Sequence, residues 1–183
     1  MRVPHLAFSA TLSTLTLAAL HTPAAATTLV RQSIERLTAA NELIVRASVV
    51  EIHSYWNPEH SFILTDVVAT PSHVLKGERR GAFTFTVPGG TVGDVTTLIL
   101  GGPDLAPGSE YVLFLSRAAL PGGPTRMTVR DLAQGVFDVR DGRATSQAIG
   151  EPLQPDAEGR IEVPGGEDGL PLEALLREIQ TRR

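Results

Sequence analysis

The sequence predicts a mainly β domain, either a sandwich or a small antiparallel barrel that is closed or nearly closed. One short helix is expected before the strands and one amphipathic helix after them. Three observations favour this class. Short segments rich in β-branched residues recur between residues 43 and 144. Glycine and proline pairs separate them, as turns require. Helical spacing of apolar residues flanks the strands on both sides.

The first 26 residues have the layout of a secretory signal peptide. Arg2 gives a positive start, Leu6 to Leu20 is an uncharged apolar run, and Ala24-Ala25-Ala26 supplies the small residues before a cut. The apolar run is about 15 residues long, short of the roughly 20 that span a bilayer. A retained membrane anchor is the alternative. We expect cleavage after Ala26, no membrane insertion afterwards, and a secreted or periplasmic chain that begins at Thr27.

The expected domain covers residues 27–149 and begins with a short helix over residues 28–40. Val30, Ile34 and Leu37 share one stripe of this helix, and Thr27 or Thr28 is its candidate cap. Strands are expected at residues 43–53, 62–70, 83–87, 95–100, 110–115, 127–130 and 135–139. Pro71 cannot donate a ladder hydrogen bond, so the chain should bulge, bend or lie on an edge there. A hairpin turn at Asp141-Gly142 should join residues 139 and 144.

The C-terminal part divides into an acidic loop and a helix. Residues 150–169 contain six acidic residues and a single basic residue, Arg160. They are also rich in proline and glycine, and such a composition is typical of solvated surface. A brief strand is expected at residues 161–163, and calcium binding is the alternative, although the EF-hand spacing is absent. Residues 170–183 should form a helix that packs on the β core. Its apolar stripe consists of Leu172, Leu175, Leu176 and Ile179.

The composition excludes several classes of site and partner. The chain has no cysteine, so it has no lipidated cysteine, no zinc site built on thiolates and no cysteine nucleophile. Its net charge is -4, which gives it no electrostatic attraction to nucleic acid. Aromatic residues make up only 5%, and stacking on bases depends on such residues.

Two strand segments carry a resemblance to a known family. Residues 42–50, ELIVRASVV, and the later segment Val74-Leu75-Lys76-Gly77 resemble the opening of netrin-like, or TIMP-like, domains. The resemblance implies an OB-type five-stranded barrel with flanking helices, and it covers about residues 29–139. Residues 87–93 and 108–115 also resemble a group of uncharacterised exported bacterial proteins. Animal inhibitors of the TIMP type chelate zinc through an N-terminal cysteine, which this chain lacks, so the resemblance supports the fold more than inhibition.

The loop after the first long strand is the candidate binding site. Residues 54–60, SYWNPEH, hold the only tryptophan and one of the two tyrosines. In an OB-type barrel, loops at this end are a usual binding edge, and amphipathic aromatic residues anchor interfaces. The candidate binding residues are therefore Tyr55, Trp56, Asn57 and His60. The alternative is that Trp56 folds back and covers the barrel core.

No motif predicts catalysis, a metal or a cofactor. The nucleophile elbow, the HExxH zinc motif, the P-loop and the dinucleotide glycine pattern are all absent from the sequence. His53, His60 and His73 are not expected to converge on a metal ion. Asp66 beside His60 offers an acid/base pair, but no hydroxyl nucleophile stands out with them.

We therefore expect an exported, non-enzymatic binding module whose partner is an extracytoplasmic protein. One form of this function is a protease-inhibitor-like domain. The alternatives are an envelope-associated structural or accessory protein without a discrete ligand and, less favoured, an exported hydrolase.

Overall fold

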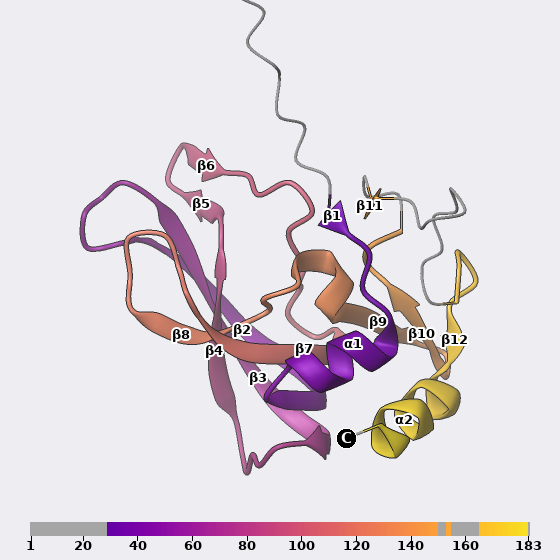
Figure 1. Ribbon diagram of the computed structural model, residues 1–183. Coiled ribbons are helices and arrows are strands. Elements are labelled where there is room, and N and C mark those ends of the chain that lie inside the picture. Colours follow the sequence, from indigo (N-terminus) through magenta and orange to yellow (C-terminus); the bar gives the residue numbers. More distant parts are fainter. Residues whose placement is uncertain (1–28, 150–152, 155–164, 183) are drawn as a thin grey trace, which may run out of the picture.

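The computed structural model describes residues 29–149, 153–154 and 165–182, and these residues form a mainly β structure with two α-helices, as the sequence predicts (Figure 1). The expected signal peptide, its cleavage site and the expected strand at residues 161–163 lie outside the described residues. Within the described part of the chain, neither helix is long and apolar enough to cross a membrane.

The elements in chain order are β1 (Leu29–Val30), α1 (Ile34–Ala40), β2 (Leu43–Trp56), β3 (Ile63–Lys76), β4 (Phe83–Pro88), β5 (Gly90–Val92), β6 (Val95–Thr97), β7 (Glu110–Ala119), β8 (Thr125–Thr128), the 3-10 turn η1 (Leu132–Gly135), β9 (Val136–Arg140), β10 (Arg143–Ser146), β11 (Leu153–Gln154), β12 (Leu170–Pro171) and α2 (Leu172–Thr181). The main sheet has the order β12-β10-β9-β7-β2-β3-β4, and β8 pairs with β7 beside this path. β5 and β6 form a separate two-stranded ribbon.

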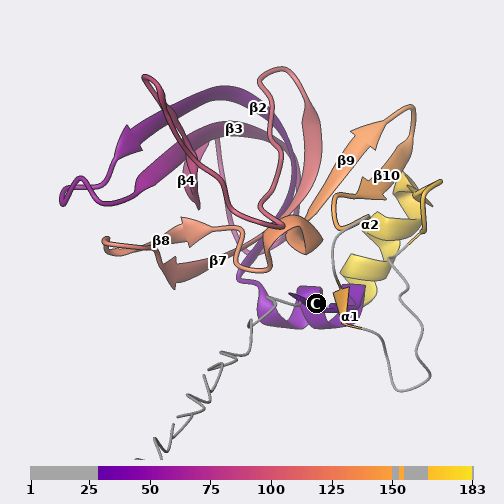
Figure 2. The same ribbon diagram turned by 90° about the horizontal axis from the view of Figure 1, so that it is seen from above.

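The long β2–β3 hairpin dominates the sheet and is strongly curved (Figure 2). Both strands are longer than the sequence pattern predicts, since each has 14 residues. The register shifts at three places along the pair, and such irregularities bend a strand. One shift lies beside Pro71, because Ala47 pairs with Pro71 while Arg46 pairs with His73. The expected irregularity at this proline is confirmed.

A closed barrel is not found among the described strands, because their pairings form an open path. β8 lies close to β4, but no ladder joins the two. Strand β7 has different partners along its length. Residues 110–113 of β7 lie between β2 and β9, whereas residues 116–119 pair with β8. The main sheet continues from β7 into β9 and β10, and the missing β4–β8 ladder leaves the barrel open.

Two hydrophobic clusters lie on opposite sides of the β2–β7 region. The inner cluster contains alternate residues of the curved sheet, among them Val45, Phe85 and Leu113. The helix-side cluster joins α1 and α2 to the intervening positions, such as Ile44 and Phe114. The expected stripe of α2 is buried in this second cluster, so the C-terminal helix packs on the sheet as predicted.

Helix α1 begins at Ile34, six residues later than predicted, and Ser33 rather than Thr27 or Thr28 caps it. The Ser33 hydroxyl accepts a hydrogen bond from the Arg36 N–H, which gives the first turn a side-chain acceptor. At the other end, Lys76 Nζ donates to the carbonyls of Thr38 and Ala39 at 2.6 and 3.3 Å. The lysine of the Lys-Gly turn thus stabilises the helix C-terminus.

Candidate binding surface

The β2–β3 loop is built around the buried side chain of Asn57. Its Oδ1 accepts hydrogen bonds from the N–H groups of Ser61 and Phe62 at 2.9 and 3.1 Å, and its Nδ2 donates to the Ser61 hydroxyl. The backbone N–H of Asn57 also donates to the Phe62 carbonyl at 2.8 Å. These bonds hold the loop in one conformation. Asn57, one of the four predicted binding residues, therefore orders the loop and is not exposed.

Trp56 and His60 lie next to each other in this loop, whose exposed residues also include Pro58, Glu59 and Ser61. Their rings stack with centroids 6.3 Å apart, Trp56 is partly exposed, and His60 is exposed. Trp56 is in neither hydrophobic cluster. A partly exposed tryptophan on an ordered loop costs little conformational entropy when a partner covers it.

Tyr55 lies in a row of polar side chains that crosses the sheet. Asp66 Oδ1 accepts hydrogen bonds from the Tyr55 hydroxyl at 3.1 Å and from the Thr86 hydroxyl at 2.6 Å. Arg126 Nη1 approaches the same oxygen to 3.9 Å. Partial burial raises the pKa of Tyr55, and the Asp66 carboxylate acts in the same direction. The phenol thus stays protonated as a donor at neutral pH.

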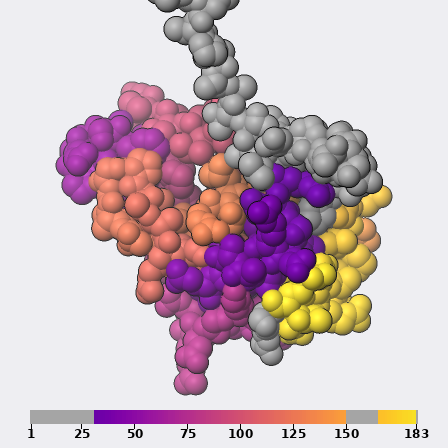
Figure 3. Space-filling view, viewed as in Figure 1, coloured from indigo at the N-terminus to yellow at the C-terminus, as the bar shows by residue number. Residues whose placement is uncertain are grey.

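The end of the β7–β8 hairpin supports the loop from one side. Gly122 has a φ of 60°, and a Cβ atom there would overlap the Asn57 side-chain amide. Figure 3 shows the two hairpin ends side by side at one end of the molecule, with the β5–β6 ribbon beside them. The sequence did not indicate this contact, since Gly122 in a Gly-Gly pair carries only a turn signal.

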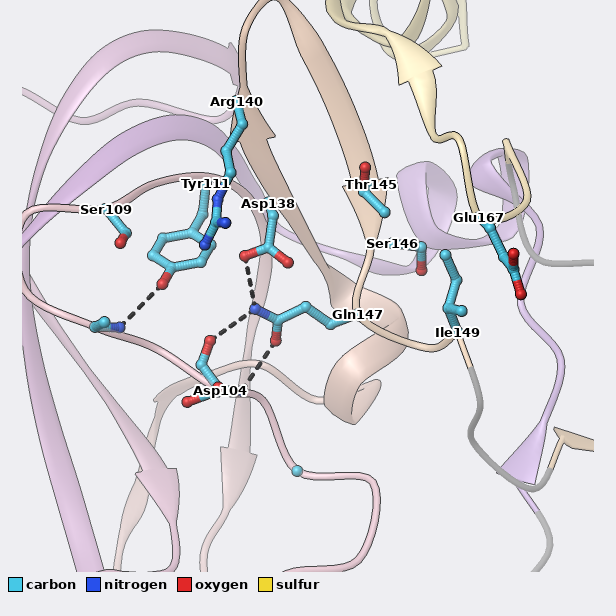
Figure 4. A pocket seen from close by; sticks show the side chains of 12 residues that line it. Asp104, Ser109, Tyr111, Asp138, Arg140, Thr145, Ser146, Gln147, Ile149 and Glu167 are labelled. Atoms are coloured by element: carbon cyan, nitrogen blue, oxygen red, sulfur yellow. Dashed lines mark hydrogen bonds between the residues drawn. The ribbon is translucent and has the colours of Figure 1, made fainter.

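Apart from the β2–β3 loop, the structure has an open hollow of about 530 Å³ between the 102–109 loop and strands β9 and β10 (Figure 4). Gln147 holds its walls together. Its Nε2 donates to the Asp104 carbonyl at 2.7 Å and to Asp138 Oδ1 at 3.1 Å, and its Oε1 accepts from the Asp104 N–H. Arg140 and Glu167 add opposite charges to the lining. Sequence reasoning missed this hollow because its residues come from segments far apart in the chain.

The described residues hold no constellation that predicts catalysis. His53 stacks on Tyr55 with centroids 6.1 Å apart, while His60 stacks on Trp56, so these two histidines have separate surroundings. Asp66 bonds to Tyr55 and Thr86 and not to His60, the residue with which the sequence offers an acid/base pair. In the part of the chain that the structure describes, no three His, Cys, Asp or Glu side chains are grouped to hold a metal ion.

Comparison of the chain with protein-family models, with curated proteins and with solved structures gives no match.

Proposed function

We propose that this protein is an exported, non-enzymatic binding module that contacts an extracytoplasmic protein through the Tyr55–His60 loop. The observation that carries the proposal is the position of Trp56, which is partly exposed and outside both hydrophobic clusters. Tryptophan is enriched among residues that dominate binding energy. Because the Asn57 bonds already order the loop, a partner gains contact without first ordering it.

An OB-type arrangement of strands is part of this proposal. The path β4-β3-β2-β7 with β8 attached to β7 and close to β4 has the connectivity that such a barrel needs, apart from the missing β4–β8 ladder. The Tyr55–His60 loop then joins the first two strands of the barrel, which is a position that binds ligands in this fold. The netrin-like or TIMP-like resemblance is proposed on the same basis, and protease inhibition is one form of the binding.

The test is capture of partners from the native envelope and culture medium on the protein produced from Thr27 onward. The capture is repeated with Trp56→Ala and with Val50→Ala, a matched control whose side chain is 57% exposed outside the loop. A captured protein is then purified and titrated against all three forms by calorimetry. The proposal expects binding by the parent and by Val50→Ala, with a loss of at least about tenfold in affinity for Trp56→Ala.

Equal affinity of the three forms would exclude the loop as the contact. Equal recovery of background proteins by all three would instead favour the structural or accessory role. Thermal melting of each variant separates these outcomes from unfolding, since Trp56 packs in neither cluster and its removal should leave the fold intact.

A further inference from the structure

Three register partners form a polar row along the floor of the open hollow beside strands β9 and β10. Tyr111 on β7 pairs with Asp138 on β9, and Asp138 pairs with Thr145 on β10. Register partners on adjacent antiparallel strands project from the same face of a sheet. Phe137 and Val139, the neighbours of Asp138, pack in and against the helix-side cluster. The polar row therefore lies on the other face, where it lines the hollow (Figure 4).

The hydroxyl of Tyr111 is buried at this floor and has a proton to donate. Tyr111 is 3% exposed, and its hydroxyl accepts a hydrogen bond from the Ala106 N–H at 2.9 Å. Among the described residues, no group accepts the hydroxyl proton. A tyrosine hydroxyl donates as well as accepts, and a buried donor without an acceptor is costly. The hollow therefore offers a donor to an acceptor that enters from outside.

Two opposite charges lie beside this hydroxyl. Arg140 follows Asp138 by two residues on β9, so both side chains project from the same face and line the hollow. Figure 4 shows the guanidinium, the carboxylate and the Tyr111 hydroxyl pointing into the same space. Asp138 Oδ1 accepts from Gln147 Nε2 at 3.1 Å, and within the described residues neither Asp138 nor Arg140 forms an ion pair.

These groups match the two charges of an α-amino acid. A guanidinium binds a carboxylate through two parallel hydrogen bonds, and a carboxylate oxygen binds an ammonium group. Arg140 and the Tyr111 hydroxyl can therefore bind a carboxylate, while Asp138 Oδ2 can bind an ammonium group beside it. An α-amino acid carries these two groups on one carbon atom.

The rim of the hollow adds negative charge. Asp104 and Glu167 are exposed and line the hollow, and Figure 4 shows them on opposite sides of Gln147. With Asp138, the lining has three carboxylates and the single guanidinium of Arg140. This excess of negative charge favours a ligand that carries a second positive group.

We propose that the hollow binds a free basic amino acid, such as lysine or arginine. Arg140 and Tyr111 bind its α-carboxylate, Asp138 binds its α-ammonium group, and the carboxylates of the rim attract its side-chain cation. The volume of about 530 Å³ lies within the range of about 300–1,000 Å³ that is typical of small-molecule sites. Gln147 already fixes Asp138 and the 102–109 loop, so binding requires little reorganisation.

This site is separate from the Tyr55–His60 loop. Strand β7 pairs with residues 43–48 of β2, whereas the loop follows the other end of β2 at Trp56. Figures 1 and 2 show the β2–β3 loop and the β9–β10 hairpin at opposite ends of the molecule. The amino-acid site therefore does not depend on a protein partner at the loop, and the two proposals can fail independently.

An NMR titration of the protein from Thr27 onward with L-lysine tests the proposal. We expect a dissociation constant of about 1 mM or lower, with amide shifts that change at Asp104, Tyr111 and Asp138 and not at Trp56. Cadaverine lacks the α-carboxylate of lysine, and L-norleucine lacks its side-chain ammonium group. Both analogues should bind at least about tenfold more weakly than L-lysine.

Four substitutions assign the charges. Arg140→Gln should weaken the binding of L-lysine at least about tenfold and leave that of cadaverine unchanged, because cadaverine has no carboxylate. Asp138→Asn should weaken the binding of both, and its side-chain carbonyl still accepts from Gln147. Arg80→Gln and Asp94→Asn are the matched controls, since they make the same changes of charge on exposed side chains outside the hollow. Melting temperatures verify that every variant is folded.

The proposal is overturned if L-lysine gives no saturable shifts up to about 10 mM, or if the shifts lie outside the hollow. Equal affinities for L-lysine and cadaverine would overturn it, as would an Arg140→Gln protein that binds L-lysine like the parent. Loss of binding in the two control variants would show attraction by net charge alone and would overturn it too. Trp56→Ala should bind L-lysine like the parent, which separates this test from that of the loop.

Discussion

Replacing Asn57 with alanine should destabilise the protein through the β2–β3 loop. The side chain is 0% exposed, and its Oδ1 is the acceptor for the N–H groups of Ser61 and Phe62. A buried donor without an acceptor costs about 1–3 kcal/mol. The substitution leaves two such donors. Because Ser61 is exposed and water can reach its N–H, each donor should cost close to the lower limit of this range, and the two together give an expected loss of about 2–3 kcal/mol in the free energy of unfolding.

The assay is denaturant unfolding followed by circular dichroism and by the fluorescence of Trp56, the only tryptophan in the chain. For a chain of this size, the expected loss corresponds to a melting temperature lower by roughly 5–10 °C. Ser61→Ala is the control, since it removes only the acceptor of the Nδ2 donor and should cost less than about 1 kcal/mol. An Asn57→Ala protein within about 0.5 kcal/mol of the parent would refute the reasoning.

Three further changes test the contacts that hold the two hairpins and helix α1 in place. Gly122→Ala should cost about 2 kcal/mol or more in thermal unfolding, because its Cβ meets the Asn57 amide, whereas Gly108→Ala, with a φ of 83° but open space, should cost only about 1 kcal/mol of backbone strain. Arg46 on β2 forms an ion pair with Glu110 on β7, with its Nη2 2.7 Å from Oε2. The hydrogen-bonded guanidinium lowers the pKa of Glu110 from 4.5, so the stabilisation by the pair is complete above that pH and is lost as the pH falls through the lowered pKa. The difference in the free energy of unfolding between the parent and Glu110→Gln should therefore become smaller as the pH is lowered, which acid unfolding curves measure. Lys76→Met should lower the free energy of unfolding by about 1 kcal/mol in urea, and an unchanged midpoint would contradict the helix-end contact.

The parts of the fold that the sequence predicts are those determined by local patterns. Alternation of Phe83 and Phe85 with threonine predicts β4, and both phenylalanines lie in the inner cluster. Asp141-Gly142 predicts the β9–β10 turn, and both residues adopt the positive φ that such a turn requires, at 49° and 72°. In both cases neighbouring residues decide the structure, so no distant contact is needed to infer it.

The parts that the sequence does not predict depend on distant contacts. Helix α1 cannot extend back to residue 28, because Leu29 and Val30 pair with the distant strand β11 and Ser33 supplies the cap. Closure of the barrel depends on whether β8 forms a ladder with β4 or only with β7, and no local pattern distinguishes the two. The main sheet is buried on both faces along β7, so its near-continuous apolar run identifies a strand without indicating which side each residue faces.

The position of Trp56 shows why the candidate site needs both sequence and structure. Residue type alone allows Trp56 to be buried or exposed, and the structure separates the two possibilities because Asn57, not Trp56, fills the interior of the loop. The two residues should therefore behave differently when each is replaced with alanine. Trp56→Ala should lose binding with little change in stability, whereas Asn57→Ala should lose both. If Trp56→Ala instead lowered the free energy of unfolding by about 2–3 kcal/mol, as Asn57→Ala should, Trp56 would have a structural role and the proposed contact would fail.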